Sequence, residues 1–310
     1  MDWEYDLHLH TTYSDGVNSL NDICAYARRK GLRRFSITDH NTIAGVMELE
    51  KNNQKPESLL YGTEFRLPGL PDFLVYFPTM TFSDAEHAEK ELTELNRLDQ
   101  EITLAVAPEF IEGNAKELWN KSSFFNKTGS FWLGTLQLAQ LISGVSHPNT
   151  EIISKIRSKK SAIFRNPKRL NAANRLLKMA SIDWVSQFAK QYRGIIVLAH
   201  PFREVARHYH EQKRMDFDFF AEKLSNLFLQ MEKWEICTTE LILTYSERWW
   251  NEKYAFSIDK ANRHLFSQCE LHGTQITIGS DSHNLESNEH ELSSEFSHAQ
   301  ICMFTPAWLK

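Results

Sequence analysis

The first half of the chain alternates short β-rich runs with amphipathic, helix-like stretches. Residues 34–38 and 102–107 are rich in apolar and β-branched side chains, which favours strands. Residues 19–31 open with a serine, a common helix N-cap, and close with a glycine, a common C-cap, so they predict a helix. Strands that alternate with helices are typical of βα units and predict an α/β protein with a parallel sheet or barrel.

The second half continues this pattern after an interruption. Further strands are predicted at residues 194–199, 241–244 and 274–279. Residues 112–192 are instead mostly polar and helix-like, with scattered aromatic side chains. We interpret about 112–192 as an inserted helical segment or a cap over the barrel mouth, within a single domain that spans 1–310.

Length and composition limit the classes of protein that fit this chain. Its 310 residues, 42% of them hydrophobic, suit a folded protein with a sizeable core. The N-terminus is acidic and lacks the apolar core of a secretory signal, and no apolar run approaches the roughly 20 residues of a membrane helix. The four cysteines form no CxxC pair, which favours reduced, buried thiols and argues against a structural zinc knot. These features predict a cytoplasmic protein without a membrane partner.

Imidazole and carboxylate side chains stand at the C-terminal ends of five predicted strands. They are His8 with His10, His40, Glu64, His200, and Asp281 with His283. One such group alone is more often a packing feature than a ligand set, but five are hard to obtain from core packing. The C-terminal ends of barrel strands converge on one face, where catalytic groups gather. Mixed imidazole and carboxylate ligands suit Zn²⁺, Mn²⁺, Fe²⁺ or Co²⁺, so the chain predicts a divalent metal centre.

Five motifs resemble those of the polymerase and histidinol phosphatase (PHP) family. They are residues 6–16 (DLHLHTTYSDG), 37–42 (ITDHNT), 62–64 (GTE), 198–201 (LAHP) and 279–283 (GSDSH). Their combination and order are specific, and they cover nearly the whole chain. The resemblance implies a distorted (β/α)7 TIM-like barrel with two or three divalent ions, which we expect to be Mn, Zn or Fe.

The resemblance also implies which residues hold the metals. The expected ligands are His8, His10, Asp15, His40, Glu64, His200, Asp281 and His283. Glu64 matches the family's bridging glutamate, which can hold two ions close together. Asp39 precedes a ligand, and we expect it to orient His40 rather than bind metal.

The chain departs from the family pattern between residues 64 and 198. The family typically supplies another histidine there, often soon after the bridging glutamate. His87 is the first histidine after His40, but it lies in a helical, polar run where a solvated face is expected. Asp72, Glu109 and His147 are the candidate replacements, and we predict His147, beside Pro148 in a polar loop, as the ninth ligand.

The resemblance favours a phosphoric ester hydrolase over the amidohydrolases, which also place HxH at the first barrel strand. Amidohydrolases usually close with a lone Asp, whereas this chain closes with Asp281 and His283. As a hypothesis, a hydroxide activated by the metals attacks phosphorus, and His200 or a metal-bound water protonates the leaving alkoxide. Arg203 and Arg66 follow ligands closely and can bind phosphate through the guanidinium fork. The candidate catalytic residues are His200, Asp15 and Arg203.

The expected partner is a phosphorylated small molecule or a nucleotide. Residues 155–193 carry eleven Lys and Arg but a single acid, Asp183, so nucleic acid is a second partner class. Two alternative functions stay open: a 3′-5′ exonuclease-type nuclease, and a catalytically degenerate PHP module that only binds. Salt dependence discriminates the first alternative because nucleic-acid affinity falls steeply with ionic strength. Metal content discriminates the second alternative, because a module that no longer catalyses should purify with little tightly bound transition metal.

Overall fold

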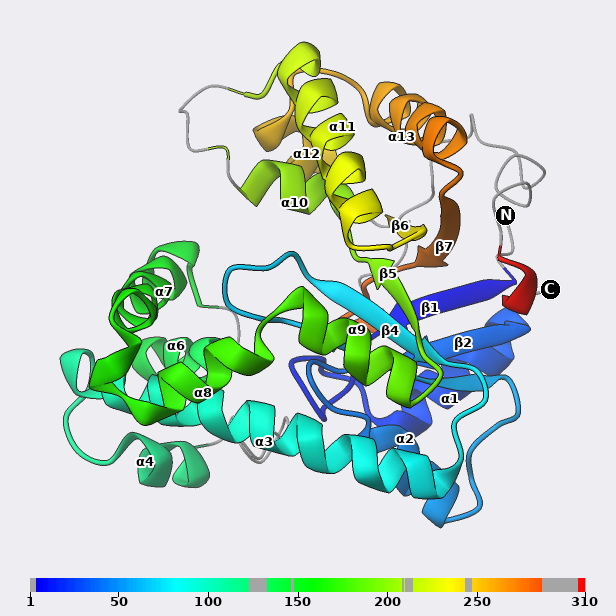
Figure 1. Ribbon diagram of the computed structural model, residues 1–310. Coiled ribbons are helices and arrows are strands. Elements are labelled where there is room, and N and C mark those ends of the chain that lie inside the picture. The colour runs from blue at the N-terminus through cyan, green and yellow to red at the C-terminus, as the bar shows by residue number, and fades with distance from the viewer. Residues whose placement is uncertain are drawn as a thin grey trace.

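Seven strands form one curved sheet at the centre of the computed structural model (Figure 1). The structure describes residues 4–122, 133–145, 148–207, 209, 214–242, 247–285 and 306–309. The strands are β1 (Tyr5–Leu9), β2 (Arg34–Ile37), β3 (Leu59–Phe65), β4 (Phe73–Phe77), β5 (Ile195–Leu198), β6 (Thr238–Ile242) and β7 (Gln275–Gly279). They neighbour one another in chain order from β1 to β7.

The two edge strands of this sheet approach each other, so the barrel is nearly closed. The backbone N–H of His10 donates to the carbonyl of Ser282 at 2.9 Å, just beyond the ends of β1 and β7. Leu9 forms an isolated parallel bridge to the same serine. The expected α/β class and TIM-like (β/α)7 barrel are confirmed.

Helices cover the outside of the barrel (Figure 1). They are α1 (Leu20–Lys30), α2 (Ala44–Lys51), α3 (Phe82–Val106), α4 (Ala115–Lys121), α6 (Thr135–Ser143), α7 (Thr150–Arg165), α8 (Asn171–Met179), α9 (Ile182–Gln191), α10 (Pro201–Arg207), α11 (Phe217–Lys233), α12 (Glu247–Lys253) and α13 (Ile258–His272), with short 3-10 turns η1 (Ala107–Glu109), η2 (Pro167–Arg169) and η4 (Ala307–Leu309). The predicted first helix is confirmed. The Ser19 hydroxyl accepts from the Asp22 N–H at 3.2 Å, the Asp22 carboxylate accepts from the Ser19 N–H at 2.9 Å, and Gly31 ends the helix with φ 66°.

The alternation of strands and helices had predicted a parallel sheet or barrel. The sheet is not fully parallel, because β4 runs antiparallel to both neighbours. Only seven residues, 66–72, connect β3 to β4. A parallel pair needs a crossover of a dozen or more residues, so this short connection forces a hairpin. Consequently β4 enters the sheet at the face where the other strands leave it.

The prediction of a strand at residues 102–107 is wrong, because these residues complete α3 and begin η1. The buried positions of α3 recur every three or four residues, at Leu92, Leu95, Leu98 and Ile102. This spacing places them on one helix face, which packs against the barrel. The β-branched run is therefore the last turn of a 25-residue helix.

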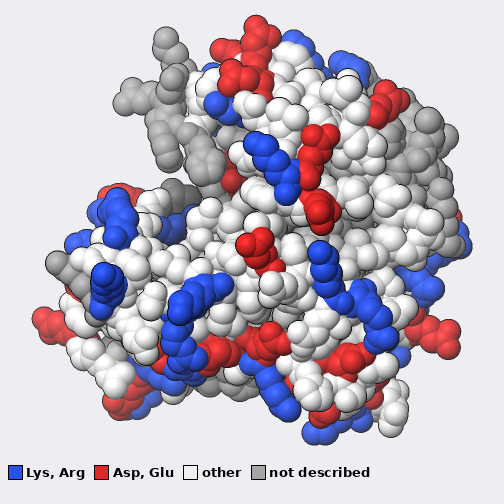
Figure 2. Space-filling view, viewed as in Figure 1, with Lys and Arg blue, Asp and Glu red and all other residues white. Residues whose placement is uncertain are grey.

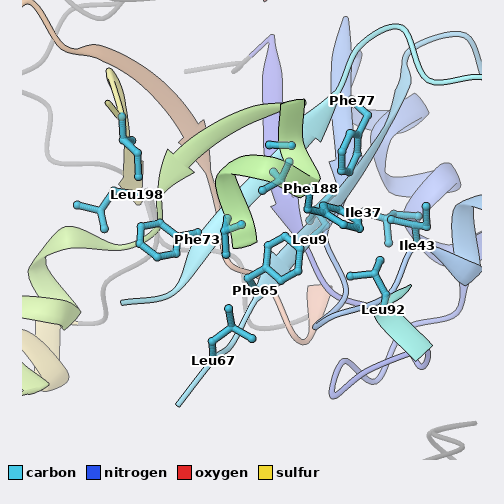
Figure 3. Packing of buried hydrophobic residues seen from close by; sticks show 14 of the residues in the cluster. Leu9, Ile37, Ile43, Phe65, Leu67, Phe73, Phe77, Leu92, Phe188 and Leu198 are labelled. Carbon is cyan, nitrogen blue, oxygen red and sulfur yellow. The ribbon is translucent and has the colours of Figure 1, made fainter. Parts of the chain in front are cut away.

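The described residues between 112 and 192 form helices and no strand. The first helices, α4, α6 and α7, enclose a small core of their own with the end of α3, around Trp119, Leu138 and Ile156. The last helix, α9, packs directly on the barrel, where Phe188 meets the rings of Phe65 and Phe77 (Figure 3). The division of the chain into one domain with an insertion at 112–192 stays a prediction.

The basic stretch at 155–193 is largely neutralised by acidic neighbours. Among its described side chains, six cationic groups form the following ion pairs: Lys155 with Glu151, Lys159 with Glu109, Lys160 with Asp99, Arg175 with Glu94, Lys190 with Glu235 and Arg193 with Asp84. On the face shown in Figure 2, Lys and Arg side chains are interspersed with Asp and Glu. This pairing reduces the positive charge that the segment offers to a nucleic acid.

Three of the four cysteines lie in the described part of the chain, where they form no disulfide. Cys269 is buried, but Cys24 is half-buried and Cys237 is exposed, so the prediction of buried thiols holds for Cys269 alone. Cys302 lies outside the described residues. Among the described helices, none combines the length and apolar character that spanning a bilayer requires.

Candidate metal centre

The strand ends bring eight of the nine predicted ligands together at one face of the barrel. Their nitrogen and oxygen atoms form three overlapping groups: His10, Asp15, His40 and His283; His8, His10, Glu64 and Asp281; and Glu64, Asp72 and His200. Within each group the possible ligand atoms all lie within 4.8 Å of one another. The ninth predicted ligand, His147, lies outside the described residues. His87 is exposed on α3, as expected, and Glu109 pairs with Lys159 on the helical segment.

The second group has the spacing that one bound ion would require. His8 Nε2 and His10 Nε2 are 3.1 Å apart, and His10 Nε2 lies 3.3 Å from both Glu64 Oε2 and Asp281 Oδ1. His8 Nε2 lies 3.5 and 3.4 Å from the same two oxygens. Ligand atoms around a tetrahedral ion bound at about 2.1 Å are roughly 3.4 Å apart. These residues therefore fit a divalent metal ion.

Glu64 joins two of the groups through its two oxygens. Its Oε2 faces the first imidazoles and lies 2.8 Å from His40 Nδ1, while its Oε1 lies 2.7 Å from His200 Nε2. Both Glu64 Oε2 and His40 Nδ1 are buried and have no partner with hydrogen-bond geometry. A buried polar atom without a hydrogen bond is costly, and a cation at this point would remove that cost. Glu64 is thus in a position where its two oxygens could each contact a different ion.

Asp15 closes the first group between two imidazoles. Its carboxylate oxygens lie 3.1 Å from His40 Nε2 and 3.0 Å from His283 Nε2. Burial alone would raise the pKa of Asp15, but His40 and His283 outweigh it and hold this pKa well below its usual range. Asp15 is therefore a carboxylate, the form that binds a cation.

The imidazoles respond to the carboxylates around them. Burial alone would lower the pKa of His40, and so would Arg66, but Asp15 and Glu64 raise it to about 9. Burial lowers the pKa of His10, and the neighbouring His283 and His40 lower it further. The pKa values of His40 and His10 are therefore shifted in opposite directions, and strongly shifted pKa values tend to gather at functional sites.

Strained backbone carries several of these residues. Six non-glycine residues of the described chain have positive φ, and three of them stand in the site: Asn41 (51°), His200 (30°) and Asp281 (51°). Asn41 lies four residues after the end of β2, and His200 and Asp281 lie two residues after the ends of β5 and β7. Left-handed backbone is uncommon for non-glycine residues, although Asn, Asp and His adopt it more readily than most, and it tends to persist at functional sites. Two of these residues, His200 and Asp281, contribute side-chain atoms to the ligand groups.

Asp39 holds the loop that carries Asp15, and not His40 as the sequence had suggested. The N–H and hydroxyl of Thr11 donate to its two oxygens at 2.8 and 2.6 Å, and the Ser14 hydroxyl donates to Oδ1. These bonds tie residues 11–14 to the end of β2. Asp39 therefore positions the Asp15 loop after β1.

Two arginines line the exposed edge of the cluster. Arg203, at the start of α10, pairs with Asp281, and its side chain is 43% exposed. Arg66, just after β3, has Nη1 3.4 Å from Asp15 Oδ2 and is 42% exposed. The ligands beneath them are nearly inaccessible, with Glu64 at 0% and Asp281 at 2% side-chain exposure. Both arginines thus contact a nearly inaccessible carboxylate of the cluster and are themselves partly open to solvent.

Glu240 is a buried carboxylate of the site that the sequence pattern did not identify. It lies in β6, where its Oε1 is 2.7 Å from His8 Nδ1 and its Oε2 accepts the backbone N–H of His200 at 3.0 Å. Because a carboxylate only accepts, Nδ1 of His8 carries the proton and Nε2 is left to face the cluster. Glu240 thereby orients one ligand and the backbone of another. Its only sequence signal is a lone acid within an otherwise β-rich run.

Glu240→Gln is expected to weaken metal binding and to reduce turnover by roughly 10- to 100-fold each. The amide offers one acceptor where the carboxylate offers two, so either His8 or the His200 backbone loses its bond. Competition with a chromophoric chelator gives the metal affinity. Glu91→Gln is the matched control, because Glu91 accepts from the Tyr192 hydroxyl away from the site. Unchanged metal affinity in Glu240→Gln would contradict this role.

Known proteins resemble this chain in sequence and in fold. A 5′-3′ exoribonuclease from Haemophilus influenzae is 45% identical over 47 residues, which are 15% of this chain and 17% of that protein. A candidate metal-dependent phosphoesterase from Bifidobacterium adolescentis is 18% identical with a TM-score of 0.52, and the match covers 97% of this chain and 94% of that one. An amidohydrolase from Chromobacterium violaceum, with bound sulfate and no metal, is 14% identical with a TM-score of 0.54 over 99% and 95% of the two chains.

These similarities differ in what they support. At such low identities the two solved structures show the shared fold alone. The chain covers less than a fifth of the exoribonuclease's length, so that match concerns only a short segment. The family model for the PHP domain, in contrast, matches residues 6–255, and the structure brings Asp281 and His283 from beyond this range to the same face. Because the match spans well over half of the chain, the protein belongs to the PHP family.

Proposed function

We propose that the protein is a metal-dependent phosphoesterase that hydrolyses phosphate esters with two or three divalent ions. The single observation that carries this proposal is the bridging position of Glu64, whose two oxygens face different groups of ligands at 0% exposure. Membership of the PHP family supports the same activity. The ions would stabilise charge on the phosphoryl oxygens and lower the pKa of a water molecule. Mixed imidazole and carboxylate donors suit Mn, Zn or Fe.

The side chains of the site would bind the phosphate and hold the ions. Arg203 and Arg66 stand at the open edge, where a guanidinium fork can bind the non-bridging oxygens of a phosphate. The side chains of Asp15 and His200 are only 7% and 4% exposed and their polar atoms lie against other members of the cluster, so we assign both as ligands rather than as proton donors. A proton for the leaving oxygen would then come from water at the exposed edge. This assignment differs from the sequence-based hypothesis, in which His200 could supply that proton.

The proposed function is tested by a hydrolysis panel with and without Mn²⁺. The panel covers p-nitrophenyl phosphate, mononucleotides, 3′,5′-bisphosphates and short oligonucleotides. We expect turnover of at least one phosphate ester, its loss on treatment with a chelator, and its return when metal is added. If the metal-loaded protein hydrolyses none of these esters, it is a binding module and the proposal is wrong. The substrate class and a cytoplasmic location stay predictions.

Arg203→Ala is expected to lower kcat/KM about 10- to 100-fold, since a hydrogen bond between charged groups contributes roughly 1.5–3 kcal/mol. The bound metal should be unchanged, because Arg203 is proposed to contact the phosphate. Steady-state kinetics and metal analysis of the same preparation measure both effects. Arg33→Ala is the control, because Arg33 is an exposed arginine that pairs with Glu4 away from the site. A loss of metal in Arg203→Ala would show instead that Arg203 serves to hold Asp281.

An exonuclease is the second candidate function. The short match to an exoribonuclease is compatible with a nucleic-acid end as substrate but does not favour it over a small phosphate ester, and that relative is named for 5′-3′ polarity whereas the sequence suggested 3′-5′. Labelling an RNA oligonucleotide at either end separates the two polarities. A steep fall in rate with salt would support this candidate, because nucleic-acid binding releases counterions. A rate that salt leaves unchanged would favour a small phosphate ester.

A further inference from the structure

We propose that Asp72, Glu64 and His200 form a third, oxygen-rich cation site, joined to the second group through Glu64, whose ion exchanges more readily than those of the other two groups. The inference rests on the proposed function and deepens it by naming the residues and the class of ion. It also replaces the sequence-based choice of His147 with Asp72, one of the alternatives considered beside it.

The antiparallel direction of β4 explains why Asp72 reaches the site. The register pairs Phe65 with Phe73 and Phe73 with Leu198, so the residue before β4 lies between the ends of β3 and β5. The N–H of Ala199 donates to the carbonyl of Asp72 at 3.0 Å and fixes it there. An antiparallel strand therefore presents a ligand at its beginning, beside strands that present ligands at their ends.

The three side chains are buried closely enough to share an ion. Asp72 is 5% exposed, Glu64 is 0% and His200 is 3%, and one ligand atom of each lies within 4.8 Å of the other two. Two carboxylates at this separation repel each other in a buried site unless positive charge lies near. Arg66 supplies some, but its one guanidinium interacts with four carboxylates: Glu64, Asp15, Asp72 and Asp281. His40 and His8 also interact favourably with the Glu64 carboxylate. An ion held by Glu64, Asp72 and His200 would further offset the repulsion between the two carboxylates.

The donor atoms change in kind from one group to the next. The first group offers three imidazoles and one carboxylate, the second two of each, and the third two carboxylates and a single imidazole. Imidazole-rich sites suit zinc and iron, whereas carboxylate and water suit Mn²⁺ and Mg²⁺. With three side-chain ligands, the third group also leaves more positions to water than the other two. We therefore expect it to prefer Mn²⁺ or Mg²⁺ and to bind it most weakly.

The test measures metal rather than activity. Purified protein is first loaded with Zn²⁺ and dialysed, and elemental analysis gives the ions retained. Mn²⁺ is then titrated in and followed by electron paramagnetic resonance. The wild-type protein should retain two zinc equivalents and bind one Mn²⁺, and Asp72→Asn should keep the zinc but lose at least about tenfold in Mn²⁺ affinity, or roughly 1.4 kcal/mol. Glu109→Gln is the control and should match the wild type.

Asp72→Glu guards against misfolding, because it keeps a carboxylate one methylene longer and should retain Mn²⁺ better than Asp72→Asn. Thermal unfolding shows whether each variant is folded. Wild-type affinity for Mn²⁺ in folded Asp72→Asn overturns the inference, and so does a wild-type protein that binds no Mn²⁺ after zinc loading. The proposed function is refuted by a different result. If Mn²⁺ binding depends on Asp72 but the protein hydrolyses no ester, the third cation site is supported and the proposed hydrolysis is wrong.

Discussion

Glu64→Gln is expected to reduce the hydrolysis of a phosphate ester by at least about a thousandfold, which corresponds to roughly 4 kcal/mol in the activation barrier. Glu64 belongs to two of the three ligand groups, and an amide cannot give each group an anionic oxygen. The substitution also leaves His8, His10 and His40 with one less negative charge to offset a bound cation. Steady-state turnover at saturating metal, with metal content measured on the same sample, gives the effect.

Glu50→Gln is the matched control for this variant. Glu50 accepts the Tyr61 hydroxyl at 2.9 Å on the outside of the barrel, so its amide should leave turnover within about twofold, as surface changes usually do. If Glu64→Gln retains its metal and its turnover falls less than tenfold, the bridging role is refuted. A loss of metal together with turnover is the result that the geometry predicts.

The sequence predicted the ligands that lie directly beyond parallel strands. His40 follows β2 and His200 follows β5, and each such residue carries its signal within a few positions of a recognisable strand. Because parallel strands end on one face of a barrel, the predicted strands alone were enough to place these side chains together. Their convergence in the structure needed no long-range information beyond the alternation of strands and helices.

The residues that the sequence missed, ranked below another candidate or gave the wrong contact depend on information that no local pattern carries. Asp72 reaches the site only because β4 is antiparallel, and β4 itself was overlooked although Pro71 and Pro78 bound its aromatic run. Glu240 lies inside a strand rather than at its end, so only the register of β6 against its neighbours shows that it meets His8. Asp39 was expected to hold the histidine beside it, but packing brings it to Thr11 instead.

The wrong prediction of a strand at residues 102–107 has the opposite cause. There the local pattern was clear, with β-branched Ile102 and Val106 near each other, and tertiary context overruled it. Residues 82–106 form one amphipathic helix whose buried face continues through both positions. Residues 102–107 taken alone favour a strand. The helix becomes clear only when the preceding leucines, which recur every three or four residues, are included. Propensity is thus a weak guide where a long helix ends.

Gly279→Ala is expected to destabilise the protein by about 1–3 kcal/mol or more, the usual cost of overpacking, and to weaken metal binding with it. A methyl group at Gly279 would lie 2.4 Å from the Cβ of His8 and 2.3 Å from Glu240 Oε1. The glutamate end can move, but the His8 Cβ is tied to the backbone of β1, so β1 and β7 must separate. That shift carries the His8 ring away from its group. Thermal unfolding and metal retention after dialysis measure the two effects.

Gly273→Ala separates this steric effect from ordinary glycine strain. An added methyl there would meet no atom within 4 Å, but φ is 62°, so the cost is that of left-handed backbone, about 1–2 kcal/mol. Gly273→Ala should therefore lower the unfolding temperature and leave metal retention unchanged, whereas Gly279→Ala should reduce both. If Gly279→Ala keeps its metal at wild-type affinity, the close contact of β7 with His8 does not hold the ligand in place. The packing of the barrel and the geometry of the metal centre would then be independent of each other at this point.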